Sequence, residues 1–167
     1  MDANQIGHIV DATDTTDTKV MVNTTKPVTI SIFEYPENPY PEVPLPPNSL
    51  PTVVDVFVSN PDAVDWPIYI ERHHTLSEVV LEREKTNLFI YYYRDGAWHK
   101  CRNTGSNHSL GIVWAYMYQD ELTGSPIIIV ALQEPAAFEV SDLIVSPEMA
   151  EPSENIEISI DVANIGG

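Results

Sequence analysis

Cys101 is the first candidate for chemistry, because it is the only cysteine among 167 residues. A nucleophilic cysteine needs a lowered pKa and an adjacent base. Lys100 and Arg102 are its neighbours in sequence, but adjacent side chains of a strand point to opposite faces. We therefore predict that Cys101 is a small buried hydrophobic residue and not a nucleophile. A single cysteine also excludes an internal disulfide.

His73 and His74 are the next candidates, as metal ligands. Adjacent histidines in a strand point to opposite faces, and the sequence nominates no third ligand. The 25 Asp and Glu residues are scattered and form no EF-hand loop. The G-x-S-x-G, H-E-x-x-H and P-loop motifs do not occur. We predict no catalytic, cofactor-binding or metal site, and no enzymatic activity for this chain.

Aromatic side chains are candidates for ligand contacts, since an exposed ring can stack on a sugar. Trp66, Tyr91 and Tyr93 would form such a platform if they share a solvent-facing surface. If they are buried or scattered, a role as a spacer is favoured. The arrangement of these three residues therefore separates two hypotheses about function.

The charge balance is strongly acidic, with 25 Asp and Glu against 8 Lys and Arg and a formal net charge of −17. Such a surface repels phosphate backbones, so the composition argues against nucleic acid as a partner. We interpret the acidity as a source of solubility. Cation binding or adaptation to salty surroundings is the alternative.

The elements that must position these residues are strands. The chain has 14 prolines against 7 glycines, and no long segment shows sustained helical periodicity. A chain of this length can bury a hydrophobic core. We predict an all-β, immunoglobulin-like β-sandwich. The expected strands are residues 5–10, 19–22, 28–35, 52–59, 64–72, 109–118 and 127–132, besides a hairpin over 88–101.

Local signals add detail to this prediction. Residues 75–78 match a capping box, which predicts the only short helix, from Leu76 to about Arg83. Pro67 requires an edge position or an irregular start of its strand. Residues 103–107 are expected to form a turn. Ile127 to Leu132 is a continuous apolar run, which is typical of a fully buried strand.

The hairpin LFIYYYRDGAWHKC has two possible registers. A two-residue turn at Asp95-Gly96 places Tyr93 opposite Trp98, and a three-residue loop with a bulge at Gly96 places Tyr92 there instead. We favour the second register, because it puts Leu88, Ile90, Tyr92 and Trp98 on one apolar face. Trp98 is then predicted to be a core anchor.

Residues 36–51 hold seven prolines among sixteen residues. Proline lacks the backbone donor and fixes φ, which excludes a helix or a central strand. A stiff crossover loop between the sheets is the favoured interpretation. A polyproline II ligand for an aromatic groove is the alternative.

Targeting signals are weak. The first twenty residues have neither a basic start nor an apolar core, and no run is long enough to span a bilayer. Asn23-Thr24-Thr25 and Asn107-His108-Ser109 fit the N-glycosylation pattern, which favours secretion. We expect either a cytosolic protein or a piece of a longer secreted chain, and the end of the sequence favours the second.

Several short motifs follow one another between residues 52 and 132. They are Val54-Asp55-Val56, Ile68-Tyr69-Ile70, Thr75 to Glu78, Leu88 to Tyr93, Asp95-Gly96, Trp98 and Ile127 to Leu132. Their order resembles a small β-sandwich domain of large archaeal and bacterial cell-surface proteins, including those with a PGF-type sorting signal. The run IIIVAL lacks the His and Phe usual in the closing strand. The resemblance implies a surface domain over residues 1–133.

The segment from Phe138 onward is similar to the opening of a CARDB-type domain, an immunoglobulin-like adhesion module of surface proteins. The matches are Asp142-Leu143, Val145-Ser146-Pro147, Pro152-Ser153-Glu154, the alternating Ile156, Ile158, Ile160 and Val162, and Asn164-Ile165-Gly166; Ser153 replaces the usual glycine. Two strands cannot close a sandwich. We expect residues 134–167 to be a linker and the N-terminal strands of a truncated, partial second β-sandwich.

Two hypotheses about function follow. The first is a non-catalytic structural or interaction module, for adhesion or spacing, in an extracellular cell-surface or secreted protein. Its expected partners are neighbouring domains of the same chain and a cell-surface polymer or protein. The alternative is an accessory carbohydrate- or polymer-binding domain of a secreted enzyme.

Overall fold

A computed structural model describes residues 7–74, 86–122, 124–133, 138–146 and 157–164. The chain divides into two compact units, Met1–Leu132 and Gln133–Gly167. The predicted helix from Leu76 to Arg83 and the expected linker over 134–137 lie outside the described residues.

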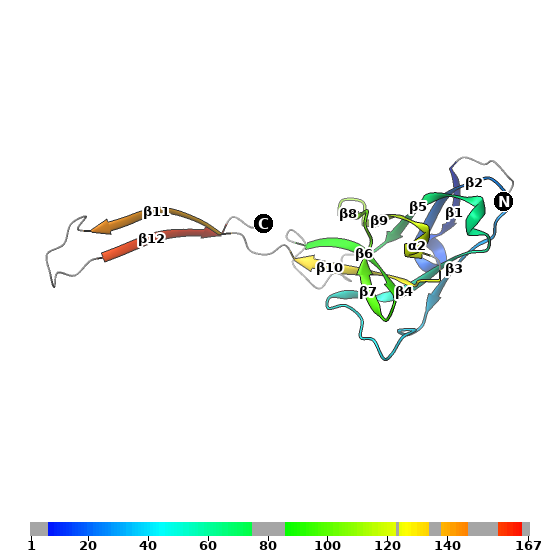
Figure 1. The fold of residues 1–167 in the computed structure, drawn as a ribbon, viewed down its shortest axis with the longest axis horizontal. Helices are drawn as coiled ribbons and strands as arrows, with labels where there is room; N and C mark the ends of the chain where they lie inside the picture. Colours follow the sequence, from blue (N-terminus) through cyan, green and yellow to red (C-terminus); the bar gives the residue numbers. More distant parts are fainter. Residues whose placement is uncertain (1–6, 75–85, 123, 134–137, 147–156, 165–167) are drawn as a thin grey trace. The chain divides into compact units, whose positions relative to one another are not determined.

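The first unit consists of two five-stranded sheets (Figure 1). The first sheet has the order β1-β2-β5-β9-β8 and the second β3-β4-β10-β6-β7. This confirms the prediction of an all-β sandwich. The strands of the first sheet are β1 (His8–Ala12), β2 (Thr18–Thr24), β5 (Val64–His73), β9 (Ile112–Met117) and β8 (Thr104–Asn107). Those of the second are β3 (Ile30–Tyr35), β4 (Ser49–Val58), β10 (Ile127–Gln133), β6 (Thr86–Arg94) and β7 (Ala97–Lys100).

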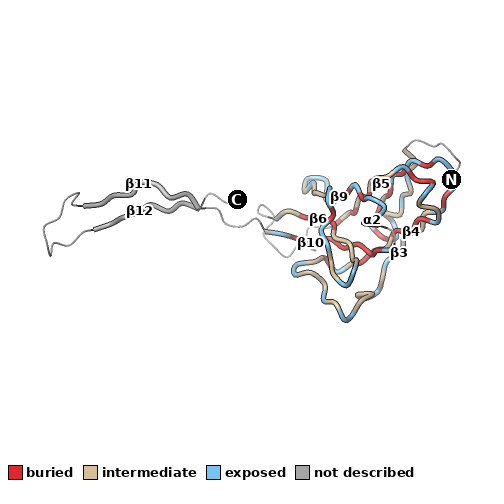
Figure 2. Tube along the Cα trace, in the orientation of Figure 1, coloured by how far each residue is buried: buried red, intermediate tan, exposed pale blue. Residues whose placement is uncertain are grey.

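The main core lies between the inner faces of the two sheets, because alternate residues of each strand point inward. It includes Val20, Ile68, Ile70, Leu88 and Ile90, each fully buried. Figure 2 shows buried segments along strands of both sheets. In β10, residues 127–131 are each at most 1% exposed, so the prediction of a fully buried strand is confirmed for these residues, whereas Leu132 is 36% exposed.

Three short helical turns lie where none was predicted. They are α1 (Thr13–Thr16), η1 (Pro61–Ala63) and α2 (Gln119–Leu122). The prediction of a single helix was therefore wrong. Residues 103–107 were also assigned wrongly, because Thr104 to Asn107 pair with β9 as an edge strand. Backbone pairing with a neighbour outweighs the turn-like composition of this segment.

Pro67 lies in β5, which is a central strand and not an edge. Proline cannot donate to a ladder, so the pairing around it is irregular. The register between β2 and β5 shifts between Met21 and Asn23, and pairing with β9 begins at Ile68. Two arrangements were expected for Pro67, an edge position or an irregular start of its strand. The structure has the irregular start.

The hairpin of β6 and β7 has the two-residue register. Tyr93 lies opposite Trp98, and Arg94 opposite Ala97. Asp95 and Gly96 have φ values of 52° and 80°, as a type I′ turn requires. The favoured bulged register was wrong, and a one-residue slip moves every side chain to the other face. Trp98 is consequently on the outer face of the second sheet and does not belong to the main core.

The proline-rich segment connects β3 and β4, which are paired neighbours in one sheet. The expected crossover between sheets was therefore wrong. The segment folds over the outer face of the β6–β7 hairpin, where Tyr40 stacks on Tyr93 with ring centroids 3.7 Å apart. Leu45 and Trp98 pack there against a second small cluster of Val53, Ile128 and Val130. A hollow of about 300 Å³ lies between the segment and the hairpin.

The second unit contains β11 (Phe138–Ser146) and β12 (Glu157–Asn164). They pair antiparallel as a two-stranded sheet, with a register shift between Ser141 and Ile144. In the part of the chain that the structure describes, no helix is long and apolar enough to cross a membrane.

Candidate ligand-binding face

The outer face of the first sheet carries an apolar row that crosses four strands. Directly opposed pairs connect Ile9 to Met21, Met21 to Tyr69, and Tyr69 to Tyr116. These side chains point outward because their neighbours along each strand point into the core. Ile9 is 54% exposed, and Met21 and Tyr116 are each 41% exposed. The row is therefore open to solvent on β1, β2 and β9, while Tyr69 on β5 is half-buried.

Trp114 widens this row on β9. Its ring centroid lies 5.9 Å from that of Tyr116, at an interplanar angle of 71°, which is the edge-to-face arrangement that aromatic pairs prefer. Trp114 is opposite Gly105 of β8, and a Cβ at position 105 would lie 2.9 Å from the indole Cζ2. The glycine leaves the space over β8 that the indole ring occupies. We call Ile9, Met21, Tyr69, Trp114 and Tyr116 the aromatic strip.

A row of polar side chains runs beside the aromatic strip on the same face. It consists of Asp11, Lys19, Glu71 and His73, and we call it the polar row. Lys19 Nζ lies 3.8 Å from a carboxylate oxygen of Asp11 and 3.9 Å from one of Glu71. Glu71 Oε1 lies 2.9 Å from His73 Nε2. These contacts fix the polar groups against the sheet.

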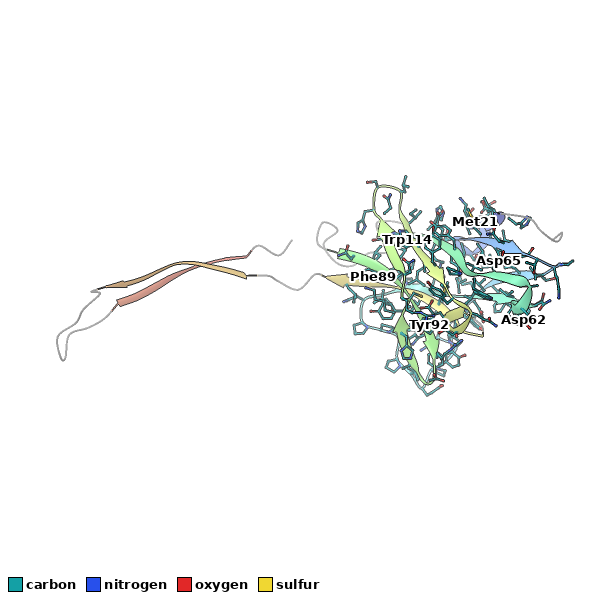
Figure 3. All side chains as sticks on the ribbon, turned by 45° about the horizontal axis from the view of Figure 1, so that its top comes forward. Met21, Asp62, Asp65, Phe89, Tyr92 and Trp114 are labelled. Atoms are coloured by element: carbon teal, nitrogen blue, oxygen red, sulfur yellow. The ribbon has the colours of Figure 1, made fainter. Side chains whose placement is uncertain are left out.

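Glu71 also links the polar row to the aromatic strip. The Tyr69 hydroxyl donates to Glu71 Oε2 at 3.1 Å. Burial, followed by this hydrogen bond to the carboxylate, raises the pKa of Tyr69 to about 12. The hydroxyl therefore stays protonated at neutral pH and holds the Tyr69 ring in place. Figure 3 shows the side chains of the unit, with Met21 and Trp114 of the first sheet labelled.

The three aromatics predicted as a platform do not come together. Tyr91 and Tyr93 are on the outer face of the second sheet, where the proline-rich segment covers them. Trp66 belongs to β5 of the first sheet, packs against the main core, and donates from Nε1 to the Pro61 carbonyl oxygen at 3.0 Å. By the criterion set from the sequence, these residues favour a spacer.

Sequence reasoning missed the aromatic strip, although part of its signal is present. A strand was expected over residues 109–118, and in β9 Ile112, Trp114 and Tyr116 share its less buried face. The intervening Val113, Ala115 and Met117 are equally apolar and form the buried side. Since both alternating sets are hydrophobic, periodicity alone cannot tell which set faces solvent.

The residues considered for catalysis and metal binding are placed elsewhere. Cys101 is 2% exposed within the main core, and burial raises the pKa of its thiol. This matches the expectation of a small buried hydrophobic residue. His73 contacts Glu71, while the backbone N–H of His74 donates to the Gly111 carbonyl. Over the described residues, no three His, Cys, Asp or Glu side chains gather in a way that could hold a metal ion.

No family model, curated protein or solved structure matches this chain. Its class is therefore defined by the fold alone, as an all-β protein of two five-stranded sheets. The resemblances to PGF-type surface domains and to CARDB-type domains stay predictions from sequence motifs.

Proposed function

We propose that this chain is a non-catalytic interaction module of a modular cell-surface or secreted protein, and that it binds through the outer face of its first sheet. One observation carries the proposal: the aromatic strip crosses four adjacent strands beside the polar row, with Ile9, Met21 and Tyr116 exposed to solvent. An exposed apolar patch rimmed by polar groups is typical of an interaction site.

Exposure of the apolar side chains of the aromatic strip to water is unfavourable for the module when nothing is bound. Burying apolar surface contributes about 25 cal/mol per Å², so covering Met21 and Tyr116 would stabilise a complex. Both side chains are 41% exposed. Ordered contacts at Tyr69 and Trp114 reduce the side-chain entropy that binding would otherwise cost.

The setting of the module rests on sequence features. The surface-domain and CARDB-type motifs support a place within a longer extracellular chain, with neighbouring domains as partners. Asn23 and Asn107, the two candidate glycosylation sites, are exposed on strands of the first sheet. The net charge of −17 argues against nucleic acid as the ligand.

A co-sedimentation assay with insoluble cell-wall polymers and with bacterial and archaeal cell envelopes tests this function. The full chain of 167 residues is compared with Tyr116→Ala and with Phe57→Ala. Phe57 is the matched control, because it is 51% exposed on the other sheet. Binding that Tyr116→Ala abolishes and Phe57→Ala preserves supports the proposal. Equal sedimentation of all three proteins, or of none, contradicts it.

An accessory polymer-binding domain of a secreted enzyme is the second candidate, and the same aromatic strip favours it. The two candidates differ in what the parent protein does after binding. In an enzyme, Tyr116→Ala would lower depolymerisation of an insoluble substrate and leave hydrolysis of a short soluble one unchanged. If the parent protein has no depolymerising activity, the first candidate, a role in adhesion or spacing, is favoured.

A further inference from the structure

We propose that the aromatic strip takes an uncharged polysaccharide, laid across the strands of the first sheet. This inference rests on the proposed function and names the ligand class of the same face. It follows from the spacing of the strip, the chemistry of its rings, the hydrogen-bonding groups beside it, and the charge of the chain.

The spacing suits a linear sugar polymer. The strip places one apolar side chain on each of four successive strands, β1, β2, β5 and β9. Neighbouring strands lie about 4.8 Å apart, so the row spans about 14 Å in three equal steps. The rings of an extended pyranose chain repeat at nearly the same interval. Consecutive sugars would therefore meet Met21, Tyr69 and Tyr116 in turn.

The rings of the strip are suited to sugar contacts. The C–H face of a pyranose is apolar, and its hydrogens pack on the electron-rich face of an aromatic ring. Tyr69 and Tyr116 lie 5.2 Å apart between centroids and are tilted by 58°. Trp114 stands beside them, at 71° to the Tyr116 ring. The three rings are inclined to one another, so they offer both ring faces and ring edges to a sugar chain.

The polar row provides hydrogen-bond donors and acceptors that can bind sugar hydroxyls. A hydroxyl both donates and accepts hydrogen bonds, so its binding site needs groups of both kinds. Asp11 and Glu71 supply carboxylate acceptors, and Lys19 supplies an ammonium donor. The side chains of Asp11 and Lys19 are 52% and 35% exposed, so a ligand on the strip can reach both.

The negative charge of the chain favours an uncharged polymer over an anionic one. The polar row contains two carboxylates, one ammonium group and the imidazole of His73, in a chain of net charge −17. A uronate-, sulfate- or phosphate-bearing polymer would be repelled by this field. The row therefore complements an uncharged polymer whose hydroxyls bind to carboxylates.

Affinity electrophoresis of the full chain in native gels tests the inference. The gels contain hydroxyethyl cellulose, xylan or mannan, and polygalacturonate serves as the anionic comparison. We expect retardation by at least one uncharged polymer, an apparent Kd raised at least tenfold in Tyr116→Ala, and no change in Phe57→Ala. Thermal melting of each variant shows that it remains folded.

Three outcomes would overturn the inference. They are retardation by polygalacturonate alone, retardation by no polymer, and retardation that Tyr116→Ala leaves unchanged. Envelope co-sedimentation separates this failure from failure of the proposed function. If Tyr116→Ala still abolishes co-sedimentation, the face binds something other than an uncharged polysaccharide. If it does not, both proposals are wrong.

Discussion

Tyr40 of the proline-rich segment stacks on Tyr93 of the hairpin, with ring centroids 3.7 Å apart and an interplanar angle of 15°. The segment around Tyr40 is held by its own hydrogen bonds. The Tyr40 N–H donates to Asn38 Oδ1 at 3.0 Å, and Asn38 Nδ2 donates to the Val43 carbonyl at 2.9 Å. A preformed loop thus covers the part of the second sheet's outer face that the β6–β7 hairpin forms.

We expect Tyr40→Ala to lower the free energy of unfolding by about 1–2 kcal/mol, because stacking contributes roughly 0.5–1.5 kcal/mol beyond area burial. Urea denaturation followed by tryptophan fluorescence measures this change. Glu37→Ala, at an exposed position of the same segment, is the control and should change stability little. Equal stability of the two variants would show that the loop does not need the stack.

Trp98 gives a sharper test of the corrected register. Its indole packs against the second small cluster, while its Nε1 is buried without a hydrogen-bond partner. Trp98→Phe removes the unpaired donor at little cost but also loses part of the ring packing, so in calorimetry it should cost clearly less than Trp98→Ala. Trp98→Ala should cost about 2–3 kcal/mol, below the roughly 3–5 kcal/mol of a fully buried tryptophan. A loss in Trp98→Phe as large as in Trp98→Ala would contradict this assignment.

Two tyrosines should make the protein sensitive to alkali. Burial is the first cause that raises the pKa of Tyr35 and of Tyr69 to about 12, and the neighbouring carboxylates Asp55 and Glu71 add to it. An unfolded tyrosine has a pKa of about 10. Between these values the folded protein keeps protons that the unfolded chain has released, so stability is full below pH 10 and falls toward pH 12.

Urea midpoints measured from pH 9 to 12 test this pH dependence. Tyr69→Phe and Tyr35→Phe each remove one titrating group, so each should flatten the decline. Tyr118→Phe is the matched control, since Tyr118 is 38% exposed and contacts neither Asp55 nor Glu71 through its hydroxyl. A decline as steep in the double variant as in the original chain would contradict the assignment.

Cys101 should be inert in the folded protein. It is 2% exposed, and burial, with a further contribution from Glu121, raises the pKa of its thiol. The thiolate is the reactive form. We expect a disulfide exchange reagent to label Cys101 only after denaturation with guanidinium chloride. Stoichiometric labelling of the native chain at neutral pH would contradict the buried position.

The sequence predicted the sandwich because its apolar runs have strand length and its prolines exclude long helices. It failed on the hairpin register for a physical reason. The turn residues allow both registers. The bulged register was favoured on the assumption that only one face of the hairpin is covered. The proline-rich segment also covers the hairpin's other face, so Tyr91, Tyr93 and Trp98 are sheltered there.

The candidate site was harder to predict than the fold. Tyr69 was visible only as the centre of an Ile-Tyr-Ile motif, and Glu71 as one of many scattered carboxylates. Their partnership depends on the pairing of β5 with β2 and β9. Strand order is set by long-range packing, which local patterns do not encode.

The first unit should fold without the second. Both five-stranded sheets lie within residues 8–133, and among the described residues β11 pairs with β12 alone. Each unit of a chain that has its own core can fold by itself. We therefore expect a chain shortened to residues 1–137 to keep the melting temperature of the full protein and to remain monomeric in sedimentation. A sharp loss of stability as a monomer would show that β11 or β12 is an integral part of the first unit.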